Sequence, residues 1–65
     1  MPVYDSIERL CSKQGISIRK LEIKAGVGNG VIGRWRFRTP KLATLQKVAD
    51  ALGVPLIAIL YGDGN

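Results

Sequence analysis

Residues 26–38 read GVGNGVIGRWRFR. This stretch is a helix candidate that is not stable alone, and it decides the fold because the rest of the chain must form a core that stabilises it. Four glycines lie between Gly26 and Gly33, and each interior glycine costs a helix roughly 1 kcal/mol relative to alanine. We expect a helix from about residue 28 or 29 to residue 35 or 36, held by Ile32 and Trp35 facing a core. Its outer face then consists of small or polar residues and one valine: Asn29, Gly30, Val31, Gly33 and Arg34.

The rest of the chain supplies that core. Apolar periodicity, together with start and end signals, predicts four further helices. They span residues 1–14, 18–25, 41–52 and 55–60. The start signals are Pro2, Ser17 and Pro55, and the end signals are Gly15 and Gly53. Cys11 and Leu42 are expected in the apolar stripes and Ile23 at the surface. The sequence therefore predicts one all-α domain over residues 1–65, a compact five-helix bundle with an aliphatic core and a flexible tail at 61–65.

Composition excludes several classes of protein. The single cysteine, Cys11, cannot form a disulfide within the chain, and the lack of histidine excludes a Cys/His metal site. No apolar run approaches the ~18 residues that span a membrane, and Asp5 and Glu8 stand where a secretory signal would be basic. The sequence shows no nucleophile–base pair, phosphate-binding loop or dinucleotide fingerprint. We therefore expect a soluble intracellular protein that needs no cofactor or metal and is not an enzyme.

The distribution of positive charge indicates a polyanionic partner. The chain carries ten Lys and Arg against five Asp and Glu, which gives a net charge of +5. Arg34, Arg36, Arg38 and Lys41 place four of these ten cations within eight residues, with no acid among them. Such clustering is typical of nucleic-acid binding, although a solvated basic face gives the same pattern.

A recurring combination of residues runs along nearly the whole chain. It comprises Ile7, Leu10, residues 15–21, residues 25–27, Ile32, Trp35, Pro40, Leu42, Leu45, residues 48–49, residues 52–54 and Leu60. The Ala-Gly-Val turn at 25–27 is weak by itself, but the combination is specific. It resembles the helix-turn-helix family of phage repressors and Cro-like regulators, the XRE type with a lambda-repressor-like fold. The resemblance implies that the second and third helices form the helix-turn-helix, with the third helix in the DNA major groove.

The resemblance also implies which residues contact DNA. Base reading falls to Asn29, Gly30, Val31 and Arg34. Phosphate contacts fall to Ser17, Arg19, Gly28, Arg36, Arg38, Thr39, Lys41 and Thr44. Chemistry agrees for two of the base readers, since Arg34 can pair bidentately with guanine and Asn29 with adenine, each pair giving roughly 1 to 3 kcal/mol of discrimination. Alternatively, Arg34 serves only as surface charge and Asn29 only as a helix cap.

Six positions depart from the family. The family commonly has Gln at the position of Ile18. It commonly has polar residues at the positions of Val31, Gly33, Phe37, Ile57 and Ala58. Three explanations of the last three stay open. They form a dimer contact, Phe37 packs beneath its loop, or the sequence was designed on this scaffold, since relatives often continue into a further domain. An alternative function is therefore a protein-interaction module that binds through its apolar surface: Val31, Phe37, Ile57 and Ala58.

The expected function is sequence-specific binding of double-stranded DNA, as a transcriptional regulator or a DNA-binding module. We expect neither a membrane nor a small-molecule ligand as partner. The chain is expected to be a monomer that can pair as a homodimer on DNA. A natural protein of this kind would work in the cytoplasm, at the nucleoid, and be encoded by a bacterium or a phage.

Overall fold

The computed structural model describes residues 3–61, whose regular secondary structure is all helical and includes no strand. Its elements are α1 (Val3–Gln14), α2 (Ile18–Ala25), the 3₁₀ helix η1 (Ile32–Arg36), α3 (Leu42–Leu52) and α4 (Leu56–Leu60). The expected start at Pro2 and the tail residues 62–65 lie outside the described residues. None of these helices is both long and apolar enough to cross a membrane.

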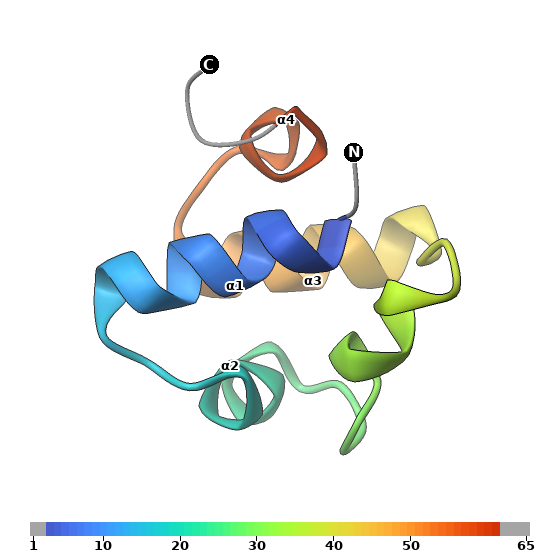
Figure 1. Ribbon diagram of the computed structural model, residues 1–65, viewed down its shortest axis with the longest axis horizontal. Helices are drawn as coiled ribbons and strands as arrows, with labels where there is room; N and C mark the ends of the chain where they lie inside the picture. The colour runs from blue at the N-terminus through green and yellow to red at the C-terminus, as the bar shows by residue number, and fades with distance from the viewer. Residues whose placement is uncertain (1–2, 62–65) are drawn as a thin grey trace.

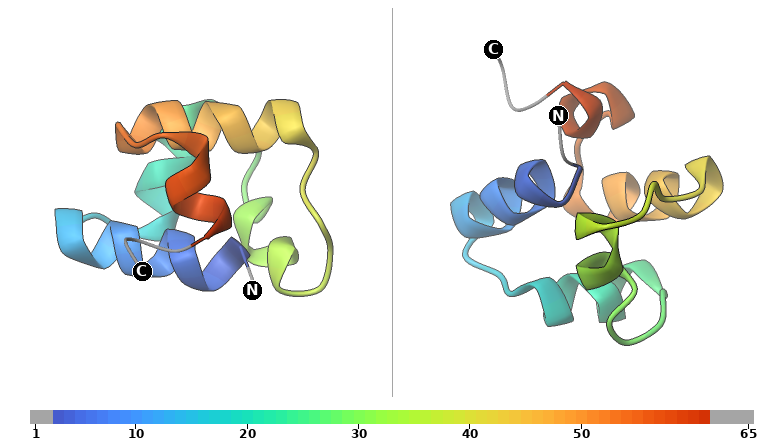
Figure 2. Two further views of the ribbon diagram at one scale, coloured as in Figure 1. Left: turned by 90° about the horizontal axis from the view of Figure 1, so that it is seen from above. Right: turned by 45° about the vertical axis from the view of Figure 1, so that its right-hand side comes forward.

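Two longer helices, α1 and α3, cross the middle of the molecule, with α2 on one side of them and α4 on the other (Figure 1). Helix α1 contacts α2, η1 and α4, and α3 contacts α2 and α4. Seen from above, α4 runs from α3 towards α1 and covers that side of the pair (Figure 2). The radius of gyration is 10.3 Å, close to the ~11 Å expected for a compact chain of this length, so the predicted compact all-α architecture is confirmed.

Every element contributes to one aliphatic core, as the sequence predicts. Each supplies at least one side chain with no exposed surface: Ile7, Leu21, Ile32, Val48 and Ile59. Trp35 and Cys11 are also buried and Ile23 is exposed, as expected. The expected burial of Leu42 is wrong, since this side chain is 66% exposed. Leu42 is the first residue of α3, and a helical side chain leans towards the N-terminus, where no earlier turn of α3 exists to pack against.

Local signals place the helix ends. The hydroxyl of Ser17 accepts a hydrogen bond from the Lys20 amide at 3.0 Å, which confirms the predicted cap of α2. Gly53 ends α3 in the left-handed conformation, with φ of 72°. Near the end of α3, the side-chain Nε2 of Gln14 donates to the carbonyl oxygen of Leu52 at 2.7 Å. This bond ties the last turn of α1 to the last turn of α3, although the two residues are 38 positions apart.

The predicted third α-helix is wrong in both length and type. Instead of a helix starting at residue 28 or 29, the chain forms a turn and then the five-residue 3₁₀ helix η1. Gly30 explains the difference, because its φ of 82° lies outside the range of any right-handed helix. The described chain therefore has four α-helices and one 3₁₀ helix, and the five-helix count is not confirmed.

One buried polar group offers a route to higher stability. Ser6 in α1 is only 3% exposed, and its hydroxyl has no hydrogen-bond partner within the described residues. We expect Ser6→Ala to raise the free energy of unfolding by about 1 kcal/mol, since it removes an unsatisfied polar group and improves helix propensity. Thermal unfolding followed by circular dichroism should show an increase in Tm of roughly 4–8 °C. Ser12→Ala, at an exposed position of the same helix, is the control; a lower Tm for Ser6→Ala would contradict the expectation.

Candidate nucleic-acid interface

The segment between α2 and η1 is a turn built on backbone hydrogen bonds. The amide of Val27 donates to the carbonyl of Glu22 at 3.1 Å, which closes the end of α2. The amide of Val31 donates to the carbonyl of Gly28 at 3.2 Å, and Gly30 takes up the left-handed conformation between them. We call residues 26–31 the reading turn, because it carries three of the four residues expected to read bases.

The buried carboxylate of Glu22 binds the reading turn from the side of the core. Glu22 is 2% exposed, and its Oε1 accepts from the Gly30 amide at 3.2 Å while its Oε2 accepts from the Ile32 amide at 3.0 Å. Arg19 Nη1 lies 3.4 Å from Oε1 and forms an ion pair with it. Glu22 is not among the residues that the sequence predicts to be functional. The signal was available, since Glu22 falls four residues after Ile18 and so lies on the buried stripe of α2.

The expected base-reading residues lie close together along the chain and face outward to different degrees. Asn29, Gly30 and Arg34 are exposed, whereas Val31 is half-buried against the core. The amide of Arg34 donates to the carbonyls of Gly30 at 3.3 Å and Val31 at 3.2 Å, so η1 continues directly from the turn. Apart from the chain neighbours of Gly33 and the backbone of η1, nothing lies within 4 Å of the point that a Cβ on Gly33 would occupy. This face of η1 is therefore free of side-chain bulk apart from Arg34.

A shallow hollow beside η1 gathers six of the twelve residues expected to contact DNA. We call it the basic hollow, and it measures about 190 Å³. Its lining comprises Val31, Arg34, Trp35, Arg38, Thr39, Pro40, Lys41 and Thr44. Small-molecule pockets usually measure about 300–1,000 Å³, so the basic hollow is too small for such a ligand. Three cations and two hydroxyls around a space of this size suit a phosphate group.

The other expected phosphate contacts lie outside the basic hollow. Ser17 and Arg19 are at the start of α2, and Gly28 is exposed in the reading turn. Arg36 turns towards α1, where its guanidinium lies 4.5 Å from the centre of the Tyr4 ring and donates to the Tyr4 hydroxyl at 3.0 Å. This hydrogen bond raises the pKa of the Arg36 guanidinium, which stays charged. Arg36 is thus outside the basic hollow, although it lines a neighbouring hollow together with Arg38.

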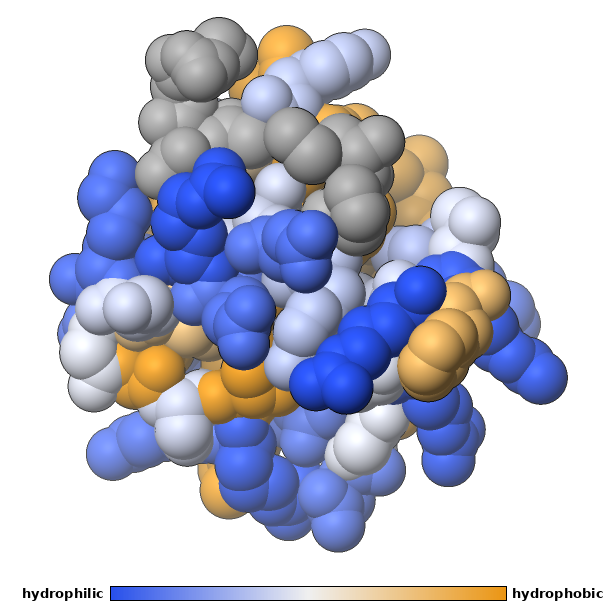
Figure 3. All heavy atoms as spheres, viewed as in Figure 1, coloured by the Kyte–Doolittle hydropathy of each residue, from blue (hydrophilic) through white to orange (hydrophobic). Residues whose placement is uncertain are grey.

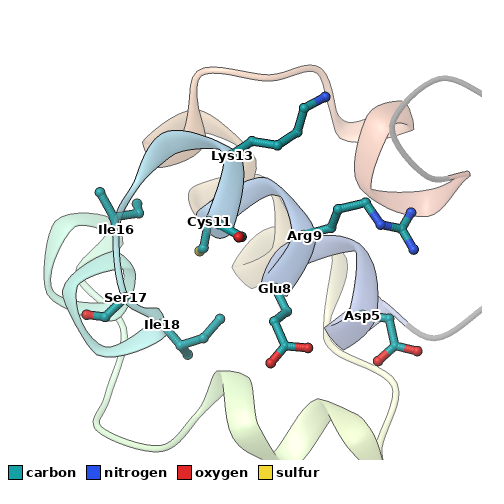
Figure 4. A pocket seen from close by; sticks show the side chains of 9 residues that line it. Asp5, Glu8, Arg9, Cys11, Lys13, Ile16, Ser17 and Ile18 are labelled. Atoms are coloured by element: carbon teal, nitrogen blue, oxygen red, sulfur yellow. The ribbon is translucent and has the colours of Figure 1, made fainter.

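A larger hollow lies elsewhere, between α1 and the start of α2, and measures about 800 Å³ (Figure 4). Asp5 and Glu8 point to the same side of α1, while Arg9 and Lys13 extend away from them (Figure 4). Burial raises the pKa of the Cys11 thiol and the charge of Glu8 raises it further, so the thiol is not activated as a nucleophile. Within residues 3–61 no group of three or more His, Cys, Asp or Glu side chains is arranged to hold a metal ion.

Apolar side chains are also exposed on the surface. The face seen in Figure 3 is mostly hydrophilic, with apolar side chains at a few separate places. Phe37 is 86% exposed, so the explanation that it packs beneath its loop is wrong. Ile57 is 61% exposed, whereas Ala58 is half-buried. Phe37 and Ile57 thus remain available for contact with another molecule.

The chain has no match among models of protein families, curated proteins or solved structures. Its function therefore has to be inferred from the geometry and charge of the site itself. The reading turn and the basic hollow are the relevant features, because together they hold most of the residues that the sequence singles out.

Proposed function

We propose that this protein is a helix-turn-helix DNA-binding domain of the repressor and Cro-like type. It binds double-stranded DNA sequence-specifically, without catalysis, as a transcriptional regulator or a DNA-binding module. The observation that carries the proposal is the basic hollow, where Arg34, Arg38 and Lys41 meet beside a turn with little side-chain bulk. Cations can hold the phosphate backbone there while the bare face of η1 approaches the base edges.

The proposed contact divides into two parts. The reading turn and η1 enter the major groove, where Asn29 and Arg34 supply the hydrogen-bonding groups and Val31 can contact a thymine methyl group. Arg38, Lys41 and their neighbouring hydroxyls bind phosphate, which adds affinity that depends on salt but not on sequence. A short 3₁₀ helix presents fewer side chains than an α-helix, and Arg34 therefore contributes most of the direct base reading.

A selection from randomised duplexes tests this function. We expect enrichment of one sequence, and affinity for it should fall steeply as salt increases. Arg34→Ala should relax the preference at one base pair, at a cost of about 1–3 kcal/mol, whereas Lys41→Ala should weaken all sequences alike and lower the salt slope by about one. Lys47→Ala is the matched control, because Lys47 is an exposed cation on α3 outside the basic hollow.

Two results of the selection bear directly on the proposal. A palindromic site would indicate that two copies bind DNA together, and a single half-site would indicate a monomer. If no sequence is enriched and no duplex binds in a salt-dependent way, the proposed function is wrong. As a regulator of this kind, the protein would work in the cytoplasm of a bacterium, encoded by that bacterium or by a phage.

The exposed apolar side chains favour a second candidate function. Phe37 and Ile57 are more than half exposed, and a protein-interaction module would use such surface to bind a partner protein. Salt distinguishes the two functions, since an apolar interface responds weakly to ionic strength and a phosphate contact responds strongly. The gathering of cations in the basic hollow makes DNA binding the better supported of the two.

A further inference from the structure

Glu22 connects two backbone amides that lie on either side of Val31. Its two carboxylate oxygens accept from Gly30 and from Ile32, so the carboxylate spans the end of the reading turn and the start of η1. The side chain that makes these bonds is 2% exposed and belongs to α2, a different element. Ile32 is buried together with the carboxylate, so water does not readily replace the acceptor of its amide, whereas Gly30 is exposed. Glu22 thus adds two side-chain acceptors to the backbone hydrogen bonds that shape the turn.

The same carboxylate fixes the position of Arg34 indirectly. The amide of Gly30 donates to Glu22, and the carbonyl of Gly30 accepts a hydrogen bond from the amide of Arg34. Gly30 thus connects the backbone of Arg34 to the carboxylate of Glu22. By contrast, Lys41, which is proposed to bind phosphate, lies at the start of α3 and has no part in these hydrogen bonds. Arg38 is joined to them one step further on, since its amide donates to the carbonyl of Arg34 at 3.0 Å. Gly30 and Arg34 are thus linked to Glu22 more directly than Arg38 and Lys41 are.

We infer that Glu22 is a positioning residue for sequence recognition, which sets the reading turn and η1 in the arrangement that matches the base edges. This inference rests on the proposed DNA binding and assigns its specificity to a residue that does not touch DNA. A carboxylate is required because both of its oxygens accept from backbone amides. A glutamine side chain of the same shape has one oxygen, and its NH₂ group would face a second donor.

Arg19 gives the positioning residue a second contact. Its guanidinium pairs with Oε1 of Glu22, yet its side chain is 54% exposed at the start of α2. An arginine at this place can therefore bind a phosphate while it remains beside the buried carboxylate. Glu22 then fixes the contact between Arg19 and the DNA phosphate backbone relative to the reading turn. When Arg19 binds its phosphate, the reading turn is placed opposite the bases that it reads.

The test compares the selected duplex with a scrambled duplex of the same length at the same salt concentration. For Glu22→Gln we expect the affinity for the selected duplex to fall by about tenfold or more, while the affinity for the scrambled duplex changes by less than about twofold. A purely structural role would instead lower both affinities by the same factor, because it changes only the folded fraction. Glu8→Gln, which removes the same charge from an exposed position of α1, should leave the ratio of the two affinities unchanged.

Nuclear magnetic resonance gives a readout that needs no DNA. In Glu22→Gln the amides of Gly30 and Ile32 should lose protection from hydrogen exchange, while those of Val48 and Ala49 in α3 keep theirs. If Glu22→Gln does not fold, Glu22→Asp serves as the second variant, because it keeps both oxygens on a side chain too short to reach both amides. The same two affinities are then measured.

The outcomes separate the two ideas. If the wild-type protein binds no duplex, the proposed function is wrong and the inference falls with it. If the wild type is specific and the Glu22 variant keeps the same ratio of affinities, the inference is overturned while DNA binding stands. If the Glu22 variant has a lower ratio of affinities for the selected and scrambled duplexes, and its Gly30 and Ile32 amides are unprotected, both the proposed function and the inference are supported.

Discussion

Gly33→Tyr is expected to lower the affinity for the selected duplex by about 100-fold, the equivalent of losing roughly two base contacts, while the protein stays folded. Apart from its chain neighbours and the backbone of η1, no atom lies within 4 Å of the Cβ position of Gly33, and its backbone is not in the left-handed conformation. A tyrosine side chain can therefore extend outward without disturbing the core. It would fill the space that a base edge needs beside Arg34.

The measurement is a duplex titration together with thermal unfolding of the same samples. Gln46→Tyr is the control, because Gln46 is exposed and lies about 200° around α3 from Thr44 of the basic hollow. We expect this control to bind the selected duplex as the wild type does. If Gly33→Tyr binds equally well, then this face of η1 does not enter the major groove.

Ile32→Ala is expected to lower the free energy of unfolding by about 2–5 kcal/mol. The side chain is fully buried and belongs to η1, the element that local propensity supports least. A chain of this length has a total stability of roughly 3–10 kcal/mol, so a large fraction of the Ile32→Ala protein would be unfolded. Denaturant titration should show a lower midpoint with an unchanged slope.

Ile23→Ala provides the matched comparison for this loss. It removes the same atoms from a side chain that is 64% exposed, and its effect should stay below about 1 kcal/mol. Similar losses for the two variants would contradict the packing described for η1. The difference between them reflects mainly what burial of Ile32 contributes, since both remove the same atoms and differ chiefly in exposure.

The sequence predicts best those features that depend on neighbouring residues. Ser17 and Gly53 mark helix ends because a cap forms between positions a few residues apart. The basic hollow was also largely predictable, since most of its cations lie close together in sequence, as Arg34, Arg38 and Lys41 do. Whether these residues bind DNA stays a prediction.

Features that depend on distant residues were not predicted. Arg36 was grouped with the other loop arginines, but Tyr4 lies 32 positions earlier in the chain and nothing local indicates the contact. The left-handed Gly30 donates its amide to Glu22 of another element, a contact that no local pattern indicates. Periodicity alone could not distinguish an α-helix from a turn followed by a 3₁₀ helix, because Ile32 and Trp35 face the core in both.

The core described above has a consequence for synthesis of the chain on the ribosome. The first helix packs against the last, and Ile59 in α4 is buried as completely as Ile7 in α1. A nascent chain therefore has no complete core until α4 has been made and has left the ribosome. We therefore expect the elements of this core to fold and unfold together, as in other small single domains.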